Sequence, residues 1–321
     1  MKNPSETLNF REALSAADSA PLLLDGGLGT HLAQRGNDVS GELWSAQILK
    51  DRPEEVRAAH ADFFAAGAQL ATTCSYQVSI DGLANASGGA GTEQVAAQAE
   101  ELLRTSVRLA REAANGSPAR WVAASVGPYG AGPGAGTEYD GAYGLEVAEL
   151  ADWHRGRLRV LAETGADVLI CETVPSLAEV QALAGEVAGL GLPVMLSLAV
   201  RTAADGQLVL GDGSDLREAA RIANDSGVFA ALGVNCCPVP VAVSALRLLR
   251  ELTDLPLLAY PNSGEIWDRA ARAWIPGTSG TDLPGAVPEL IAAGARIIGG
   301  CCQVGPEQIT RVGSELRRVQ G

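Results

Sequence analysis

A chain of 321 residues with a formal net charge of −14 is poorly suited to bind nucleic acid or an anionic membrane, so we expect neither as a partner. Hydrophobic residues make up 47% and charged residues 19%, a globular composition that can fill a large core. The first residues lead into no apolar segment, and no later run is long enough to span a bilayer, which predicts a cytoplasmic protein. In such a protein the six cysteines are more often metal ligands, catalytic groups or buried side chains than a disulfide framework.

Eight short apolar runs, each followed by a helical pattern, organise the chain. Continuous apolar runs of this length are typical of strands buried on both faces of a parallel sheet. The runs are Leu22–Asp25, Gln69–Cys74, Trp121–Val126, Asp167–Glu172, Pro193–Val200, Phe229–Cys236, Leu255–Tyr260 and Ala295–Gly300. A 3.6-residue apolar spacing predicts helices such as Glu93–Ala114, Glu146–Glu163 and Ser214–Asn224. Eight alternations without a break in composition predict a single (β/α)8 TIM barrel over residues 1–321, with residues 1–20 as an N-terminal extension.

Polar residues follow several predicted strands, at the carboxyl ends where parallel α/β folds keep their chemistry. The sequence Asp25-Gly26-Gly27 follows the first run. Its glycines would let backbone N–H groups approach an anion and Asp25 could accept an ammonium, although an ordinary turn has the same sequence. Glu172 ends the fourth run, where a buried carboxylate is costly unless a cation meets it. Asn262, in the segment after the seventh run, adds polar lining that turn chemistry explains nearly as well.

Two cysteine motifs are the most informative feature of the sequence. Cys236 and Cys237 end the sixth run, and Cys301 and Cys302 follow the eighth. Even-numbered strands of a barrel contribute side chains to common layers, so these thiols can converge and hold a soft or borderline metal, which we take to be zinc. Adjacent cysteines close a four-cysteine structural site awkwardly, since such sites usually separate paired cysteines by two to four residues. We therefore expect Cys236, Cys301 and Cys302 as ligands with one exchangeable position, and Cys237 as a packing thiol.

The adjacent pair imposes one further condition. Neighbouring residues in a strand point to opposite faces, so Cys301 and Cys302 can share one ion only if the strand has already ended. The Gly299-Gly300 pair makes that turn plausible. Cys74 and Cys171 fall inside apolar runs and are expected to be buried small side chains.

The longest gap without a helical pattern, Gly127–Tyr143, is rich in glycine and contains three of the five tyrosines. A long loop after the third strand is expected to overhang the mouth of a barrel. Lysine occurs twice and histidine three times, and neither type ends a predicted strand. A Schiff-base lysine and a histidine-based metal centre are therefore not expected.

Together these motifs resemble the homocysteine S-methyltransferase family, whose members are zinc-dependent (β/α)8 barrels, from about Leu22 to the C-terminus. The similar segments are Leu24–Gly27, Leu43–Ser45, Ala71–Gln77, Ser125–Gly130, Cys171–Thr173, Gly233–Cys236, Tyr260–Glu265 and Gly299–Cys302. The resemblance implies that Cys236, Cys301 and Cys302 bind zinc and that the Asp25 turn and Glu172 bind the backbone groups of homocysteine. It also implies that the following residues bind substrate: Asp25, Gly26, Gly27, Trp44, Thr73, Tyr76, Tyr129, Glu172, Asn235, Asn262 and Glu265.

The implied reaction is methyl transfer from a sulfonium donor to the thiol of homocysteine, giving methionine. Tyr76 and the Tyr260–Glu265 segment resemble the branch of the family that uses S-methylmethionine, with S-adenosylmethionine as the other sulfonium donor considered. Trp44 and the tyrosines expected near the mouth could meet the donor cation through their ring faces. A homo-oligomer is compatible with the sequence. Two other functions use the same residues: a thiol-based zinc-binding or redox-sensing barrel, and a barrel that only binds ligands.

Overall fold

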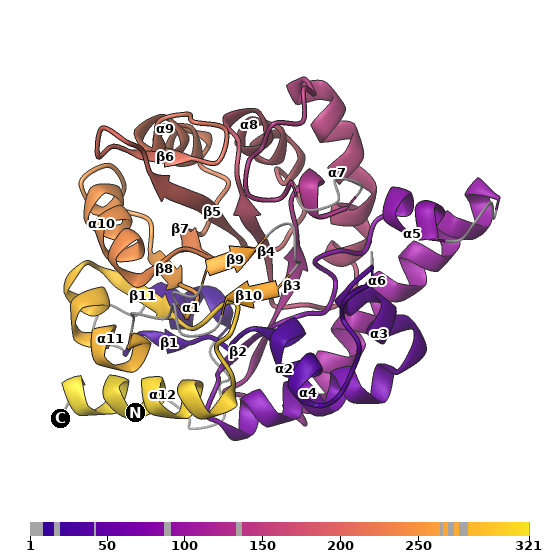
Figure 1. Cartoon of the computed structure of the whole chain (residues 1–321), viewed down its shortest axis with the longest axis horizontal. Coiled ribbons are helices and arrows are strands. Elements are labelled where there is room, and N and C mark those ends of the chain that lie inside the picture. The colour runs from indigo at the N-terminus through magenta and orange to yellow at the C-terminus, as the bar shows by residue number, and fades with distance from the viewer. Residues whose placement is uncertain are drawn as a thin grey trace.

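The structure is a computed structural model that describes residues 9–15, 20–41, 43–86, 91–132, 137–263, 266–268, 273–275 and 282–320. Eight parallel strands form a ring with helices around its outside (Figure 1). The strands are β1 (Leu22–Leu23), β2 (Leu70–Thr72), β3 (Trp121–Val126), β4 (Val168–Val174), β5 (Val194–Thr202), β7 (Ala231–Asn235), β8 (Leu257–Tyr260) and β11 (Ala295–Ile298). Neighbouring strands run β1-β11-β8-β7-β5-β4-β3-β2, and a parallel bridge between Leu24 and Leu70 closes the ring. The predicted (β/α)8 barrel is confirmed, since each predicted run overlaps one of these strands.

Helices connect the strands, and their ends follow local sequence rules. They are α2 (Leu28–Gln34), α3 (Ser45–Asp51), α4 (Pro53–Ala65), α5 (Ile80–Ala86), α6 (Thr92–Ala114), α7 (Val147–Ala162), α8 (Leu177–Glu186), α9 (Leu216–Ser226), α10 (Val239–Arg250), α11 (Leu283–Ala292) and α12 (Pro306–Gln320). Glu146 and Glu149 form a reciprocal capping box at the start of α7, which satisfies two N–H groups that a helix start leaves unpaired. The three helices predicted by apolar spacing correspond to α6, α7 and α9.

The interior of the ring is apolar at the end where the strands begin. Leu24, Leu70, Trp121, Ile170 and Met195 belong to one buried cluster there. Helix α1 (Phe10–Ser15) covers this end, with the Phe10 ring edge-on to Trp121 at a centroid distance of 6.3 Å. The predicted N-terminal extension therefore contributes a helix that seals the barrel floor, a contact that the sequence pattern did not reveal.

Two small antiparallel additions were not predicted. Strand β5 continues past the barrel rim to Thr202, where β6 (Leu208–Leu210) pairs with it. A hairpin of β9 (Ile266–Asp268) and β10 (Ala273–Ile275) follows β8 and crosses the centre of the ring in the view of Figure 1. In the part of the chain that the structure describes, no helix is both long and apolar enough to cross a membrane.

Candidate functional site

The Cys236, Cys301 and Cys302 side chains meet at the carboxyl ends of β7 and β11. Their sulfur atoms all lie within 4.8 Å of one another. Cys236 and Cys301 are joined by a disulfide with an S–S distance of 2.11 Å, and the Cys236 and Cys302 sulfurs are 3.9 Å apart. Among the residues that the structure describes, this is the only group of three or more histidine, cysteine or carboxylate side chains close enough to share an ion. The predicted convergence of the three thiols is therefore observed.

The chain turns out of β11 before it reaches the two adjacent cysteines, as that convergence requires. Strand β11 ends at Ile298, and Gly299 and Gly300 lead into the cysteines. A Cβ atom on Gly300 would lie 2.1 Å from the Val304 side chain, so only glycine fits this turn. The Cys301 N–H donates to the Pro261 carbonyl at 2.8 Å, which ties the turn to the segment after β8.

A tetrahedral zinc ion fits this donor set. Zn–S bonds near 2.3 Å place sulfur ligands about 3.8 Å apart. The Cys236–Cys302 pair has nearly that spacing, and reduction of the disulfide frees the Cys236–Cys301 pair to reach it. Burial raises the pKa of the Cys302 thiol to about 12, so a cation is needed to hold this group as a thiolate.

Asn235, one residue before Cys236, braces the thiols from inside the barrel. Its side-chain oxygen accepts hydrogen bonds from the Thr173 N–H at 2.9 Å and the Ser197 hydroxyl at 2.7 Å. Its amide nitrogen donates to the Thr173 hydroxyl at 2.8 Å and lies 4.0 Å from the Cys301 sulfur. Thr173 and Cys236 both have positive φ, +60° and +49°, a conformation that non-glycine residues keep only where their surroundings enforce it. The asparagine side chain thus fixes the strained Thr173, and Asn235 directly precedes the strained Cys236.

Two buried carboxylates lie at the same end of the barrel. Asp25 is 1% exposed and accepts hydrogen bonds from the Thr72 N–H and hydroxyl, both at 2.9 Å. Glu172 is 8% exposed and accepts from the hydroxyls of Ser125 and Tyr260, the latter at 3.1 Å. Burial raises the pKa of both carboxyl groups, and the charge of Glu172 adds to the increase at Asp25. Two buried acids, one of which senses the charge of the other, form a suitable site for a cation.

The glycines after Asp25 serve close packing. A Cβ atom on Gly26 would lie 2.3 Å from the Val304 carbonyl, and one on Gly27 would lie 2.6 Å from the Cys301 carbonyl. The expectation that these N–H groups face an anion is wrong for Gly27, whose N–H donates to the Val304 carbonyl at 2.9 Å. The Asp25 turn is thereby fastened to the cysteine turn.

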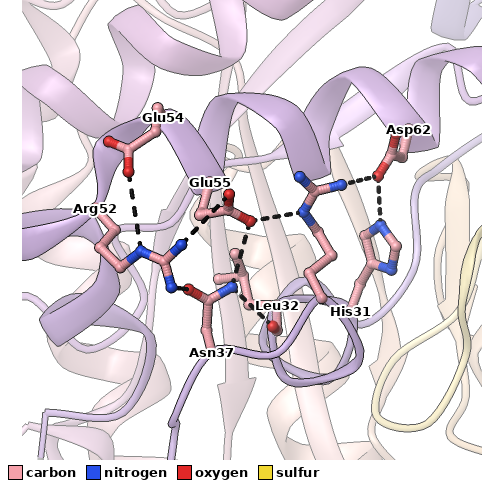
Figure 2. Close-up of polar contacts among 8 residues, drawn as sticks. His31, Leu32, Asn37, Arg52, Glu54, Glu55 and Asp62 are labelled. Atoms are coloured by element: carbon pink, nitrogen blue, oxygen red, sulfur yellow. Dashed lines mark hydrogen bonds and ion pairs between the residues drawn. The ribbon is translucent and has the colours of Figure 1, made fainter.

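Helix α2, which starts just after this turn, is tied to α4 by a polar network (Figure 2). His31 Nε2 lies 2.8 Å from Asp62, and Arg35 reaches both Asp62 and Glu55, at 2.8 Å and 3.0 Å. These contacts join α2 to α4 and so help to fix the helix that follows the Asp25 turn.

A family model described as homocysteine S-methyltransferase matches residues 22–316. The chain belongs to the homocysteine S-methyltransferase family. Homocysteine S-methyltransferase YbgG of Bacillus subtilis is 36% identical over 314 residues, which cover 94% of this chain and 97% of YbgG. The Escherichia coli homocysteine S-methyltransferase is 39% identical over 296 residues, 90% of this chain and 93% of that protein. The solved structure of the E. coli homocysteine methyltransferase MmuM in a metallated form has a TM-score of 0.80 and 36% identity, with 94% of this chain and 99% of that chain covered. The expected family and methyltransferase class are confirmed.

The other residues expected to bind substrate in this methyltransferase occupy varied places. The Tyr76 ring lies against the backbone of Gly127, because a Cβ atom there would be 2.8 Å from it. Trp44 packs on Gly29 of α2 in a similar way. The Thr73 hydroxyl is 2.7 Å from that of Ser75 and accepts from the Ser125 N–H at 3.0 Å, so it links β2 to β3.

For three other residues implied by the resemblance, the structure gives little information about substrate binding. The Tyr129 ring packs 5.1 Å from both Tyr143 and Trp153, on the α7 side of the loop. Asn262 is buried and its N–H donates to the Cys237 carbonyl at 3.1 Å. Glu265 lies outside the described residues.

The remaining thiols behave as packing groups. Cys74, Cys171 and Cys237 are each at most 2% exposed and belong to the main core. Burial raises the pKa of each to about 12, which keeps all three protonated. This agrees with the roles expected for them from the sequence.

Residues that orient the site escaped the sequence reasoning. Ser125 and Tyr260 hold Glu172, Thr72 holds Asp25, and Ser197 holds Asn235. Each is a polar residue near the carboxyl end of an otherwise apolar strand, and that position was the signal that could have identified it.

Proposed function

We propose that the protein transfers a methyl group from a sulfonium donor to the thiol of homocysteine, giving methionine. The observation that carries the proposal is the meeting of three thiols and two buried carboxylates at one end of the barrel, in a chain of this family. The thiols supply a site for a metal, and the carboxylates supply a site for an ammonium. Homocysteine has a thiol and an ammonium separated by a short chain, so it can reach both.

Cys236, Cys301 and Cys302 would hold Zn²⁺, because thiolate is the ligand type that zinc prefers in closed or partly closed sites. The bound ion would supply the positive charge that keeps these thiols, and the thiol of homocysteine, deprotonated at neutral pH. Asn235 keeps Cys301 in place, and the strained backbone of Cys236 aims its sulfur at the other two. Zinc binding of this kind needs all three thiols reduced, which supports a reducing compartment, and we propose the cytoplasm.

Asp25 and Glu172 would bind the homocysteine ammonium. A cation between them offsets the desolvation of both carboxylates and lowers their raised pKa values. The Ser125 and Tyr260 hydroxyls keep Glu172 in one orientation for this contact.

The transfer itself requires no acid or base from the protein. A lone pair of the homocysteine thiolate forms the new S–CH₃ bond, and the donor's S–CH₃ bond breaks with its electron pair staying on the donor sulfur. The sulfonium becomes a neutral thioether and the thiolate becomes the thioether of methionine, so both charges vanish in the step. An active site without a histidine near the thiols is consistent with this balance.

We infer that S-methylmethionine is the preferred donor. Because the donor loses its positive charge, a pocket that grips it by full ion pairs would stabilise the ground state more than the transition state. Aromatic faces attract a sulfonium moderately, by roughly 0.5–2 kcal/mol each. One aromatic candidate is Tyr76, which follows β2, lies against Gly127 and is near Thr173, a partner of Asn235.

The test is a competition among donors with homocysteine as the acceptor. Zinc-loaded protein is offered equal S-methylmethionine, S-adenosylmethionine and betaine, and kcat/KM is measured for each. Methionine should form from the sulfonium donors, most efficiently from S-methylmethionine. Efficient use of betaine would contradict the sulfonium argument, and a preference for S-adenosylmethionine would contradict the choice of donor.

A second candidate function is a thiol-based redox sensor. The Cys236–Cys301 disulfide favours it, because it shows that the fold brings these two thiols within bonding distance. Such a sensor has no need for the buried Asp25 and Glu172. Reversible zinc release on oxidation, in a protein that gives no methionine with any donor, would support this function over methyl transfer.

A further inference from the structure

A cluster of buried charged groups lies behind the site, between α7, α8 and the end of β3, and the proposed reaction does not use it. Arg157 is 7% exposed, and His154 and Glu179 are fully buried. His154 Nε2 is 2.7 Å from Glu179 Oε1, and the Arg157 guanidinium lies 4.6 Å from the centre of the Trp153 ring. Burial lowers the pKa of Arg157 to about 10, so it remains charged at neutral pH. Keeping a charge in such a place costs free energy unless its contacts compensate for it.

The contacts of Arg157 are few, and they converge on one segment. Arg157 Nη2 donates to the Gly127 carbonyl at 2.6 Å, while within the described part of the chain its Nε and Nη1 have no hydrogen-bond partner. Glu179 Oε1 accepts from the Tyr129 N–H at 2.6 Å. The two helices therefore hold the segment 127–129 at both ends, directly after β3. An arginine that stays so incompletely paired is poorly explained by stability alone, since an apolar side chain of similar size is often as stabilising at a buried position.

The segment that Arg157 holds is the surface on which Tyr76 rests. A Cβ atom on Gly127 would lie 2.5 Å from the Tyr76 carbonyl and 2.8 Å from its ring. Burial raises the pKa of the Tyr76 hydroxyl, and the nearby Thr173 side chain opposes that increase. Thr173 in turn accepts from Asn235, whose amide nitrogen lies 4.0 Å from the Cys301 sulfur. An unbroken series of contacts thus runs from Arg157 to the thiols.

We propose that Arg157 is a positioning residue for methyl transfer: with Glu179 it fixes segment 127–129, and thereby the Tyr76 ring, beside the path of the methyl donor. Arg157 touches neither substrate. The inference rests on the proposed function for its effect on the reaction, whereas the positioning itself is a property of the folded chain. A shift of Tyr76 would affect the donor while leaving the thiols and the Asp25–Glu172 pair in place.

The test compares Arg157→Met with Arg159→Met, an exposed arginine two residues along the same helix. Three quantities are measured on zinc-loaded protein: the homocysteine Kd, kcat/KM for S-methylmethionine, and amide hydrogen exchange in residues 121–132. Arg157→Met should lower kcat/KM for the donor about tenfold or more, the usual effect of losing one charge-assisted hydrogen bond, with homocysteine Kd and zinc content as in the wild type. The Tyr129 amide should exchange faster, and Arg159→Met should change none of these. The loss should not add to that of Tyr76→Leu, because both changes act by taking one ring away from the donor.

Several results would overturn the proposal. Unchanged donor kinetics in folded Arg157→Met would do so, as would equal losses of homocysteine affinity and donor kinetics, which indicate general destabilisation. If Arg157→Met does not fold, Arg157→Lys keeps the charge and Gly127→Ala displaces Tyr76 from the other side. Both should show the donor-specific loss, and normal donor kinetics in either would contradict the inference. If wild-type protein transfers no methyl group from any donor, the proposed function fails, and the exchange rate of the Tyr129 amide alone decides the positioning claim.

Discussion

The replacement of Glu172 by glutamine tests the assignment of the substrate ammonium most directly. The side chain keeps its size, and its remaining oxygen can still accept from Ser125 or Tyr260. What disappears is the negative charge that faces the proposed ammonium. Zinc content should be unchanged, because Glu172 is not among the three clustered sulfur ligands.

The magnitude follows from the burial of the group. Glu172 is 8% exposed and, among the described residues, its hydrogen-bond partners are neutral hydroxyls, so solvent and neighbouring cations screen it little. A hydrogen bond to a charged group contributes roughly 1.5–3 kcal/mol, which corresponds to about 10- to 150-fold in affinity. Asp25 remains to hold the ammonium, so complete loss of binding is not expected.

The assay uses a ligand that lacks the charge. Calorimetry with zinc-loaded protein compares homocysteine with 4-mercaptobutanoate, which has the same chain and no amino group. Wild-type protein should prefer homocysteine, and Glu172→Gln should lose most of that preference while it binds 4-mercaptobutanoate as before. Glu163→Gln, an exposed glutamate after α7, is the matched control. Equal discrimination in Glu172→Gln and wild type would refute the reasoning and return Glu172 to a structural role.

Other predictions concern the thiols, the second carboxylate and the donor. Cys236→Ser should lose bound zinc and activity while Cys237→Ser keeps both, and full zinc occupancy in Cys236→Ser by metal analysis would contradict the ligand assignment. The pKa of Asp25 is higher in the folded chain than its ordinary value near 4, so above that pH the folded state binds more protons than the unfolded state. The free energy of unfolding of ligand-free protein should therefore fall as pH rises through the raised pKa. Asp25→Asn should reduce this loss in thermal unfolding measured across pH, and parallel profiles for the two proteins would argue against it. Raised ionic strength should weaken use of a cationic sulfonium donor, because the negative surface attracts it at low salt, and a salt-independent KM would exclude such steering.

Much of this architecture was predictable because its signals are local. Each strand of the barrel is a mostly apolar run, since it is largely buried on both faces, and each is followed by a helix with clear periodicity. The cysteines stand where two such runs stop, and the carboxyl ends of parallel strands meet at one end of a barrel. The positions of Cys236, Cys301 and Cys302 in the chain were therefore enough to predict that their side chains meet.

What could not be predicted depends on distant pairs. Whether Asp25 or Gly27 faces a ligand depends on Val304 and Cys301, which pack on this turn from the other end of the chain. The role of Arg157 depends on a carbonyl thirty residues away along the sequence. The floor helix α1 is too short for periodicity to identify. In each case the residue can be read from the sequence, but the distant residue that it contacts cannot.

The distribution of charge around the site agrees with the proposal that it binds cations. Among the described residues, the hydrogen-bond partners of Asp25 and Glu172 are neutral backbone and hydroxyl groups, and the three clustered thiols are held by an asparagine and by backbone contacts. These partners orient anions without neutralising them. Burial raises the pKa of both carboxyl groups, so ionising them is costly, and the proposed cations, a metal ion, an ammonium and a sulfonium, would offset that cost. Methyl transfer then consumes the sulfonium charge and the thiolate charge together, so the products are bound less strongly than the substrates. A barrel end whose buried acids lack charged partners therefore suits the proposed sulfonium donor better than the neutral thioether that the donor becomes.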